Sequence, residues 1–502
     1  MFFKFRSAAT IGLEAVPMEI EIDINKGQTC FNIVGLADTS IQEAKERIHS
    51  AIKNSEFTYP FNYRVIINLA PADLPKEGPA YDLPMAVGII LISQNLTINL
   101  DDALLVGELA LDGNVRHTHG ILPLAIFAKT HNLKRLFVPE ANAEEAALVT
   151  GLEILPVKNL KQIINHLTDA ELITPFVSIN KTSTPIITYE LDMAYIKGQE
   201  FAKRALEIAA SGGHNILMSG PPGSGKTLLA RTLPSILPQL NDDEALEITK
   251  IYSVAGLLSD NLIRERPFRS PHHTISNVAL VGGGRYPRPG EISLAHRGVL
   301  FLDEFPEFPR TVLEAMRQPL EDGTITVSRA QGTLSFPARF ILVASQNPCP
   351  CGFNGDPDHD CTCTATQVDR YQKKISGPIL DRIDLHIEVP RVKFDKLASD
   401  ELAEPSEKIR SRVETARTRQ KIRFQNTSIH TNSEMRNTEL REFCRLGTDA
   451  LNLLRSAVQQ MHLSARAYNR ILKLSRTIAD LAESDIIKLE HLAEALQYRS
   501  KI

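Results

Sequence analysis

Apolar and polar residues alternate with a period of two through Met18–Ile24, a pattern that predicts a half-buried strand. The spacing changes to the helical period after Asp38 and Thr39, which offer an N-cap for a helix. The apolar face of that predicted helix consists of Ile41, Ala44, Ile48, Ala51 and Ile52. Strand and helix patterns therefore follow one another in this part of the chain.

Four further segments continue this mixed pattern. Residues 63–69 predict a strand, and the longer apolar run at 83–92 predicts a buried helix. A hairpin is predicted over residues 104–115, because Asp112–Gly113 is a favoured turn pair. A helix and then a strand at Arg135–Pro139 follow. The fold class predicted for this unit is α/β.

The composition divides the chain into several units. Residues 171–190, with prolines and scattered β-branched residues, predict a linker. It separates a first unit, residues 1–170, from a second at residues 191–391. Residues 392–502 carry helical patterns only and predict a helical domain. A chain of 502 residues is too long for one core, so separate domains are expected.

Charge and hydropathy indicate a globular protein without membrane helices. With 43% hydrophobic and 23% charged residues the composition is that of a soluble globular protein. The net charge of −4 gives no overall attraction to nucleic acid, so such binding requires local basic patches. No apolar run approaches the ~18–20 residues of a membrane helix, and Met1–Arg6 does not resemble a signal peptide. We expect a cytosolic protein, with cysteines free or metal-bound.

The clearest chemical motif is residues 220–227, which fit the P-loop pattern G-x-x-x-x-G-K-[ST]. An apolar run at His214–Met218 predicts a strand before it, and a helical pattern follows from Leu228. Lys226 supplies a positive charge to the phosphates, and Thr227 offers a hydroxyl to Mg²⁺. The predicted ATP-binding residues are Gly220, Pro221, Pro222, Gly223, Ser224, Gly225, Lys226 and Thr227.

A second motif predicts the other half of a phosphate-transfer site. The apolar residues of Gly298–Leu302 are followed by Asp303 and Glu304, the pattern of a Walker B strand. We expect Asp303 to hold Mg²⁺ through water and Glu304 to deprotonate the attacking water. The alternative is a core strand that ends in two solvated acids.

Four segments of the first unit resemble the N-terminal domain of the ComM/YifB-type magnesium chelatase-like ATPases: Val34–Leu36, Asn68–Asp73, Lys76–Pro79 and Gly107–Gly113. The resemblance implies a Lon-protease-like domain of the ribosomal S5 domain 2 type. It also implies an AAA+ P-loop NTPase core and a C-terminal α-helical lid. The resemblance extends over nearly the whole chain.

The Lon-like resemblance does not carry proteolysis with it. Lon-type proteases place a nucleophilic serine after Gly-Pro and pair it with a lysine. Ala80 follows Gly78–Pro79 here, and residues 120–124 contain no lysine at the expected partner position. An absent hydroxyl cannot be activated as a nucleophile. We therefore expect a scaffold or a partner-binding module.

The AAA+ resemblance implies roles for residues beyond the two nucleotide motifs. Asn347 follows an apolar strand and matches sensor 1, the amide that positions the lytic water. The alternative is an ordinary turn before Pro348. Arg466 and Arg470 lie on one face of a segment that resembles the sensor 2 helix. By its place in that segment, Arg466 is the preferred residue to touch the γ-phosphate.

Arg382 lies in a segment, residues 376–385, that resembles the carrier of the arginine finger in the chelatase and MCM branch. The resemblance implies that Arg382 reaches the γ-phosphate bound by a neighbouring subunit. A finger that acts in trans requires a ring, so this residue carries the prediction of an oligomer, and the resemblance implies a homo-hexamer. The alternative is a structural ion pair with Asp381 or Asp384.

Two loops indicate what the ring could encircle. Residues 264–290 are rich in glycine, proline, arginine and histidine, a composition typical of a functional insertion. Residues 324–336 predict a hairpin that resembles the DNA-tracking hairpin of MCM-type helicases. Arg329 at its tip would contact backbone phosphate, which carries no sequence information. The alternative is a solvated arginine.

Four of the six cysteines form the pattern C-x-C-x9-C-x-C: Cys349, Cys351, Cys361 and Cys363. Four thiolates in one loop match a tetrahedral zinc site made of cysteines alone, with His359 as a substitute ligand. Free thiols or a redox pair are the alternative. Four protein ligands leave no open position, so a catalytic zinc is not expected.

Together these observations predict an ATP-hydrolysing ring that uses ATP and Mg²⁺, with structural Zn²⁺ in the cysteine loop, and the resemblance implies that the ring is a hexamer. The resemblance implies a DNA helicase or branch-migration motor acting on single-stranded or branched DNA during natural transformation, with recombination proteins as partners. One alternative is a magnesium chelatase-type ATPase subunit, for which the N-terminal domain and cysteine loop were not expected. A regulator or unfoldase without DNA motor activity is another.

Overall fold

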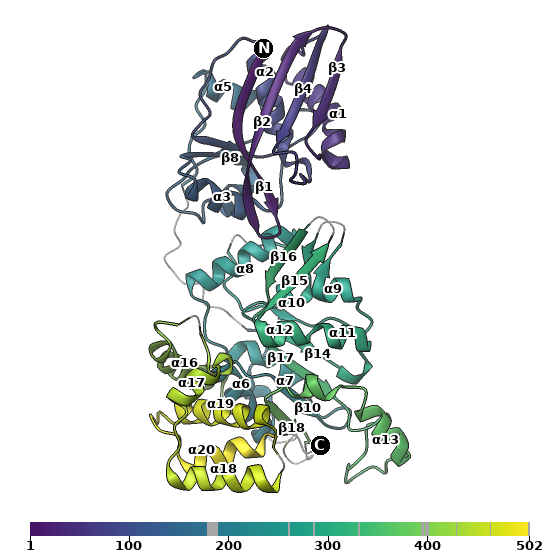
Figure 1. Cartoon of the computed structure of the whole chain (residues 1–502), viewed down its shortest axis with the longest axis vertical. Coiled ribbons are helices and arrows are strands. Elements are labelled where there is room, and N and C mark those ends of the chain that lie inside the picture. Colours follow the sequence, from purple (N-terminus) through teal and green to yellow (C-terminus); the bar gives the residue numbers. More distant parts are fainter. Residues whose placement is uncertain are drawn as a thin grey trace. The chain divides into compact units, whose positions relative to one another are not determined.

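The computed structural model describes residues 1–177, 189–259, 262–284, 287–329, 332–392, 396, 401–427, 429–461 and 463–499 (Figure 1). At Arg329 and Gly332 it describes the backbone alone. The predicted linker at 171–190 falls mostly outside these residues. No described helix is long and apolar enough to cross a membrane.

The chain forms two compact units. The first contains Met1–Pro185 and Ala245–Ile263, and the second contains Ile186–Glu244 and Arg264–Ile502. The sequence-based division placed Ala245–Ile263 with residues 191–391, and it separated residues 392–502 from them. Segments distant in sequence thus share each unit, and the predicted domain boundaries stay a prediction.

The first unit contains a four-stranded sheet in the order β1 (Phe2–Ile11), β2 (Glu14–Lys26), β4 (Tyr63–Ala70) and β3 (Cys30–Val34). Helix α1 (Thr39–Asn54) begins after Asp38, whose Oδ1 accepts a hydrogen bond from the backbone N–H of Ile41 at 2.8 Å. The five apolar residues predicted for its face are all buried. Helix α2 (Asp82–Ser93) is buried along most of its length, as predicted.

A second, parallel sheet of this unit corrects the predicted hairpin. Its strands are β5 (Ala103–Leu105), β8 (Arg135–Pro139) and β9 (Glu153–Val157). Only β6 (Glu108–Leu109) and β7 (Val115–Arg116) form the hairpin around Asp112–Gly113. All three residues of β5 are buried, and strands covered on both faces favour a parallel sheet. The remaining helices are α3 (Ile121–Thr130), α4 (Ala143–Ala146) and α5 (Leu160–Leu167).

The second unit is built on a five-stranded parallel sheet, which confirms the α/β class. Its order is β11 (Phe268–Arg269), β14 (Val299–Leu302), β17 (Ile341–Gln346), β10 (Ile216–Ser219) and β18 (Leu385–Glu388). Shorter strands form two hairpins: β12 (Gly282–Gly283) with β13 (Arg288–Pro289), and β15 (Thr324–Arg329) with β16 (Gly332–Pro337). The β15–β16 hairpin directly precedes β17, as predicted.

The described helices between residues 200 and 400 belong to the second unit, except for part of one of them. They are α6 (Glu200–Gly212), α7 (Lys226–Thr232), α8 (Asp242–Ala255), α9 (Asn277–Val281), α10 (Glu291–Leu294), α11 (Arg310–Ala315), α12 (Arg317–Asp322), α13 (Ala365–Gln372) and α14 (Gly377–Leu380). Helix α8 begins in the second unit and ends in the first.

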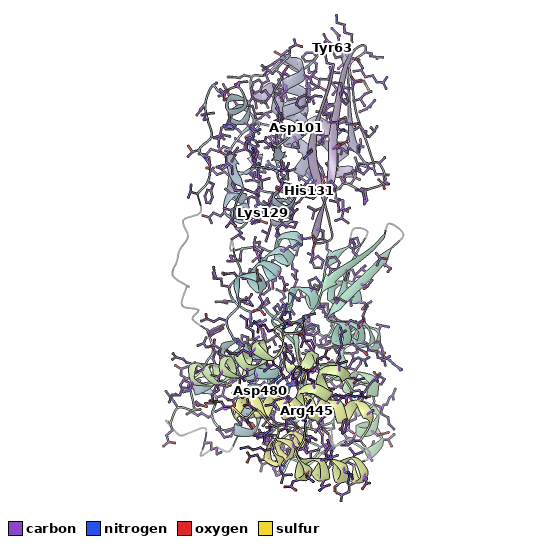
Figure 2. The ribbon with its side chains drawn as sticks, turned by 60° about the vertical axis from the view of Figure 1, so that its left-hand side comes forward. Tyr63, Asp101, Lys129, His131, Arg445 and Asp480 are labelled. Atoms are coloured by element: carbon purple, nitrogen blue, oxygen red, sulfur yellow. The ribbon has the colours of Figure 1, made fainter. Side chains whose placement is uncertain are left out.

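The C-terminal part is helical, as predicted, with α16 (Ser406–Arg423), α17 (Asn437–Phe443), α18 (Thr448–Gln460), α19 (Ala465–Leu481) and α20 (Leu489–Gln497). These helices share one apolar core with α6 and the parallel sheet. Asp480 on α19, labelled in Figure 2, is buried and accepts hydrogen bonds from Arg423 of α16. The helical region and the sheet are therefore one folded body.

Candidate active site

The P-loop joins β10 to α7, at the carboxyl end of the parallel sheet. Gly223 and Gly225 have φ values of +76° and +88°, in the left-handed region that favours glycine. A Cβ on Gly220 would lie 2.2 Å from the carbonyl oxygen of Val389. The strand is Ile216–Ser219 and not 214–218, because the buried His214 bonds to side chains of Asp384 and Thr477.

Two polar groups in this loop are suited to phosphate. The ammonium of Lys226 donates to the carbonyls of Gly220 at 2.7 Å and Pro221 at 2.9 Å. Burial lowers the pKa of Lys226, because it disfavours the charged ammonium. A phosphate bound in the loop would stabilise that charged form. The buried hydroxyl of Ser224 has no hydrogen-bond partner among the described residues. Both observations fit an anion at this loop.

Thr227 and Asp303 meet across neighbouring elements. The hydroxyl of Thr227 donates to Oδ2 of Asp303 at 3.0 Å. The other carboxylate oxygen of Asp303 accepts from Ser345 of the adjacent strand β17 and from the backbone N–H of Glu304. A hydroxyl beside a carboxylate provides the oxygen ligands that Mg²⁺ prefers, so the two residues fit the predicted metal site.

Asn347 lies beside the P-loop. It directly follows β17, and its Oδ1 accepts a hydrogen bond from the ammonium of Lys226 at 3.3 Å. The pairing of β17 with β10 brings these two residues together, although they are 121 positions apart. The amide is thus placed where it can contact a phosphate bound by the loop.

Glu304 has a contact that sequence reasoning missed. Its backbone adopts φ +53°, a left-handed conformation that is uncommon for a side chain this large. Its Oε2 lies 3.4 Å from Nδ1 of His273, which belongs to the insertion at 264–290. The only sequence signal was the unusual composition of that insertion, which does not identify a partner.

Arg382 lies at the amino ends of the strands, and the P-loop lies at their carboxyl ends. It precedes β18, whereas the P-loop follows β10. Its guanidinium contacts Glu321 and donates to the carbonyl of Pro378 at 2.7 Å. The alternative pairings with Asp381 or Asp384 are wrong, because Asp381 pairs with Arg470 and Asp384 with His214.

The two sensor 2 candidates lie near Arg382, at the same amino ends of the strands. All three line a cavity of about 440 Å³, together with Asn215 and Gly298 from the starts of strands. Arg470 donates to the carbonyls of Leu380 and Ile383, at 3.2 and 2.6 Å. Arg466 is exposed and has no hydrogen-bond or ion-pair partner in the described part of the chain. Arg466 is therefore the more available of the two.

The four cysteines of the loop converge on one point. Their Sγ atoms all lie within 4.8 Å of one another, and the three pairs among Cys349, Cys351 and Cys361 are separated by 3.3, 3.6 and 3.7 Å. Four sulfurs at about 2.3 Å from a central zinc would be roughly 3.8 Å apart, so the group fits one tetrahedral ion. A hydrogen bond from the backbone of Phe353 lowers the pKa of Cys351 to about 5. His359 is not part of this group.

Arg329 ends strand β15, opposite Gly332 of β16. Its side chain, together with residues 330–331 at the turn, lies outside the described residues. The predicted contact of Arg329 with DNA phosphate therefore stays a prediction.

Three family models match the chain. "Magnesium chelatase, subunit ChlI" matches residues 192–397, "Subunit ChlI of Mg-chelatase" matches 20–142, and "Magnesium chelatase, subunit ChlI C-terminal" matches 403–499. The chain is 44% identical to the competence protein ComM of Haemophilus influenzae, over 99% of this chain and 97% of ComM. It is 43% identical to YifB of Escherichia coli, over 98% and 96%. A 26% match to the DNA replication licensing factor Mcm2 of Drosophila melanogaster covers 49% of this chain and 26% of Mcm2.

Proposed function

Because the chain belongs to the magnesium chelatase subunit ChlI family of AAA+ proteins, we propose that it hydrolyses ATP at sites shared between subunits of a hexameric ring. The observation that carries this proposal is the convergence of Lys226, Thr227, Asp303 and Asn347 at one edge of the sheet. Asp303 and Asn347 follow the ends of strands β14 and β17, and Lys226 and Thr227 begin helix α7.

The side chains at the carboxyl ends of the strands have different roles in phosphoryl transfer. The P-loop backbone and Lys226 bind the phosphates, and Thr227 with Asp303 holds Mg²⁺, which neutralises charge on the phosphate oxygens. Glu304 accepts the proton of the attacking water, and Asn347 orients that water toward the γ-phosphate. His273 lies 3.4 Å from Oε2 of Glu304 and competes with the attacking water for this carboxylate oxygen.

The ring is supported by the position of the arginines. Arg382 and Arg466 lie at the amino ends of the strands, while the P-loop lies at the carboxyl end of β10. A four-residue strand spans roughly 13 Å, too far for these guanidinium groups to reach a phosphate in their own P-loop. They therefore serve the nucleotide of the neighbouring subunit, Arg382 as the arginine finger and Arg466 as sensor 2.

We infer DNA, single-stranded or branched, as the substrate on which the ring acts. The relative ComM is named a competence protein, and Mcm2 is named a DNA replication licensing factor. The β15–β16 hairpin ends at Arg329, a cation suited to backbone phosphate. The motor would drive helicase movement or branch migration during natural transformation, beside recombination proteins. The first unit, with Ala80 in place of a nucleophile, serves as a scaffold or a partner-binding module.

The cysteine group supports a structural Zn²⁺ held by Cys349, Cys351, Cys361 and Cys363. Four protein ligands complete the coordination of zinc, so the ion would stabilise this loop and take no part in the reaction. Metal analysis of the purified chain tests this assignment directly.

A magnesium chelatase-type ATPase subunit is the second candidate, because the family models carry that name over both units. Unwinding of a branched DNA substrate separates the two functions. We expect the wild-type chain to unwind it with ATP, and Arg329→Ala to lose unwinding while still hydrolysing ATP without DNA. If no DNA form stimulates ATP hydrolysis or is unwound, the DNA motor function is excluded. The function of a chelatase-type subunit is then favoured.

A further inference from the structure

The cysteine loop, residues 349–363, packs directly against the P-loop. Gly352 follows Cys351 in this loop and has φ +87°. A Cβ on Gly352 would lie 2.6 Å from Cδ of Pro222, the third residue of the P-loop motif. Only glycine fits at this distance, so the backbone of the cysteine loop rests against the ring of Pro222.

A second contact links the cysteine loop to the segment that packs against Gly220. The carboxylate of Asp356 in the cysteine loop is buried and pairs with Arg391 at 3.3 Å, and the Arg391 guanidinium lies over the ring of Phe353. Two residues before Arg391, the backbone N–H of Val389 donates to the carbonyl of Ser219 at 2.8 Å. The carbonyl of Val389 is the group that excludes a side chain at Gly220. The cysteine loop therefore contacts the phosphate-binding loop directly at Pro222, and it is linked through Arg391 to the segment that packs on Gly220.

A third connection is covalent. Cys349 is only two residues after Asn347, whose amide contacts Lys226. On the far side of the loop, α13 begins two residues after Cys363, and Gln372 at its end donates to the carbonyl of Pro348 at 3.4 Å. The segment between Asn347 and α13 is thus closed on itself, with the four thiols at its centre.

The residues inside this closed segment supply little apolar core. Of residues 349–363, only Cys349 and Gly352 are buried as whole residues. A loop of this kind depends on a metal for order, because the ligand bonds replace the missing hydrophobic contacts. The contact of the loop with Pro222 and the position of Asn347 then depend on the same ion.

We propose that the metal held by the four cysteines controls nucleotide binding, because the ordered cysteine loop holds Pro222 and Asn347 in position. With the ion bound, the P-loop is held between Gly352 and Val389 in a form ready for phosphate. Without the ion, Pro222 and Asn347 lose this support and ATP binds more weakly. The inference rests on the proposed zinc and ATP sites, and it assigns the zinc site a role in ATP binding.

The test measures zinc content and binding of a fluorescent ATP analogue with Mg²⁺, using the full chain. We expect wild type to carry about one zinc per chain. Cys361→Ser, a ligand distant from Asn347, should lose the zinc and bind the analogue about tenfold more weakly or worse. Gly352→Ala should keep the zinc and also bind weakly, because its Cβ displaces Pro222. Cys30→Ser, which lies in the first unit, is the control and should change neither quantity.

The outcomes distinguish a failure of this inference from a failure of the proposed zinc site or the proposed ATP site. A zinc-free Cys361→Ser chain that binds the analogue like wild type overturns the inference and leaves the ATPase proposal intact. Wild type without zinc overturns the metal site, and wild type that binds zinc but no analogue overturns the ATP site. If circular dichroism shows that Cys361→Ser is unfolded, Gly352→Ala decides: wild-type affinity in that variant overturns the inference.

Discussion

Nδ1 of His273 lies 3.4 Å from Oε2 of Glu304, so an insertion residue engages the carboxylate expected to activate water. We expect His273→Ala to raise ATP hydrolysis in the absence of DNA by roughly two- to fivefold, because the carboxylate becomes free to accept a proton. Stimulation by DNA should shrink accordingly. The measurement is the steady-state hydrolysis rate with and without DNA.

The control for that variant is His272→Ala. The rings of His272 and His273 lie 4.1 Å apart between centroids, and His272 bonds to Thr274. The His272 variant should leave the basal rate near that of wild type. A fall in the basal rate of His273→Ala would instead mean that His273 positions Glu304 for the reaction.

Glu304→Gln should bind ATP without turning it over, because an amide cannot accept the proton of the attacking water. We expect a loss of hydrolysis of about 10²–10⁴-fold with nearly unchanged nucleotide affinity. Lys226→Ala should differ by losing affinity as well, since its ammonium is the group proposed to contact the phosphates. Equilibrium binding and hydrolysis, measured on the same preparations, distinguish the two variants; equal affinity in both would contradict this division of roles.

Arg382→Ala should lower hydrolysis about 10³-fold or more while retaining nucleotide binding. If Arg382 acts on the neighbouring subunit, mixing Arg382→Ala with Lys226→Ala should restore part of the activity. In such rings the P-loop of one variant meets the intact arginine of the other. Absence of any recovery in rings that form would argue for a role within one chain.

Glu321→Gln provides the matched control for Arg382, since Glu321 is its ion-pair partner in the structure. Glu321 is the exposed member of this pair, and an ion pair with an exposed partner contributes about 1 kcal/mol to stability. We therefore expect Glu321→Gln to retain most of the activity. An equal loss of activity in both variants would indicate that Arg382 acts only through this pair.

His386 on β18 predicts a pH dependence of stability. Burial, with the nearby charge of Arg470, lowers the pKa of His386 to about 4 from its ordinary 6.5. Between these values the unfolded chain binds a proton that the folded chain does not, so stability falls as pH drops from 6.5 toward 4. His386→Asn should reduce the loss of unfolding free energy between pH 7 and 5 by roughly 1–2 kcal/mol.

Denaturant unfolding at the two pH values measures this effect. The exposed His131, labelled in Figure 2, offers a control in the first unit. His131→Asn should leave the pH dependence of the second unit unchanged. The same slope in wild type and His386→Asn would show that other groups dominate the acid response.

The local motifs could be predicted from sequence because their chemistry lies in consecutive residues. The glycines of 220–227 specify a loop without side chains, and the apolar run before Asp303 specifies a strand with acids at its end. The cysteine pairs likewise needed only a short loop to meet. The face of α1 followed from helical spacing alone.

Partners across long separations were decided by the tertiary structure. Residues 103–105 joined β8 instead of the predicted hairpin, because a fully apolar segment is stabilised most in a covered parallel sheet. Arg382 contacts Glu321 and not the neighbouring acids, which other elements had already engaged.

The sequence by itself determined which residues form the P-loop, which acids follow the strand at Gly298–Leu302 and which thiols share a loop, since backbone conformation over a few residues is set locally. Only the tertiary structure decided that Arg382 and Arg466 lie at the edge away from the P-loop, that His273 meets Glu304, and that Gly352 rests on Pro222. Those relationships depend on strand order and close packing, which emerge when the whole sheet and its helices assemble.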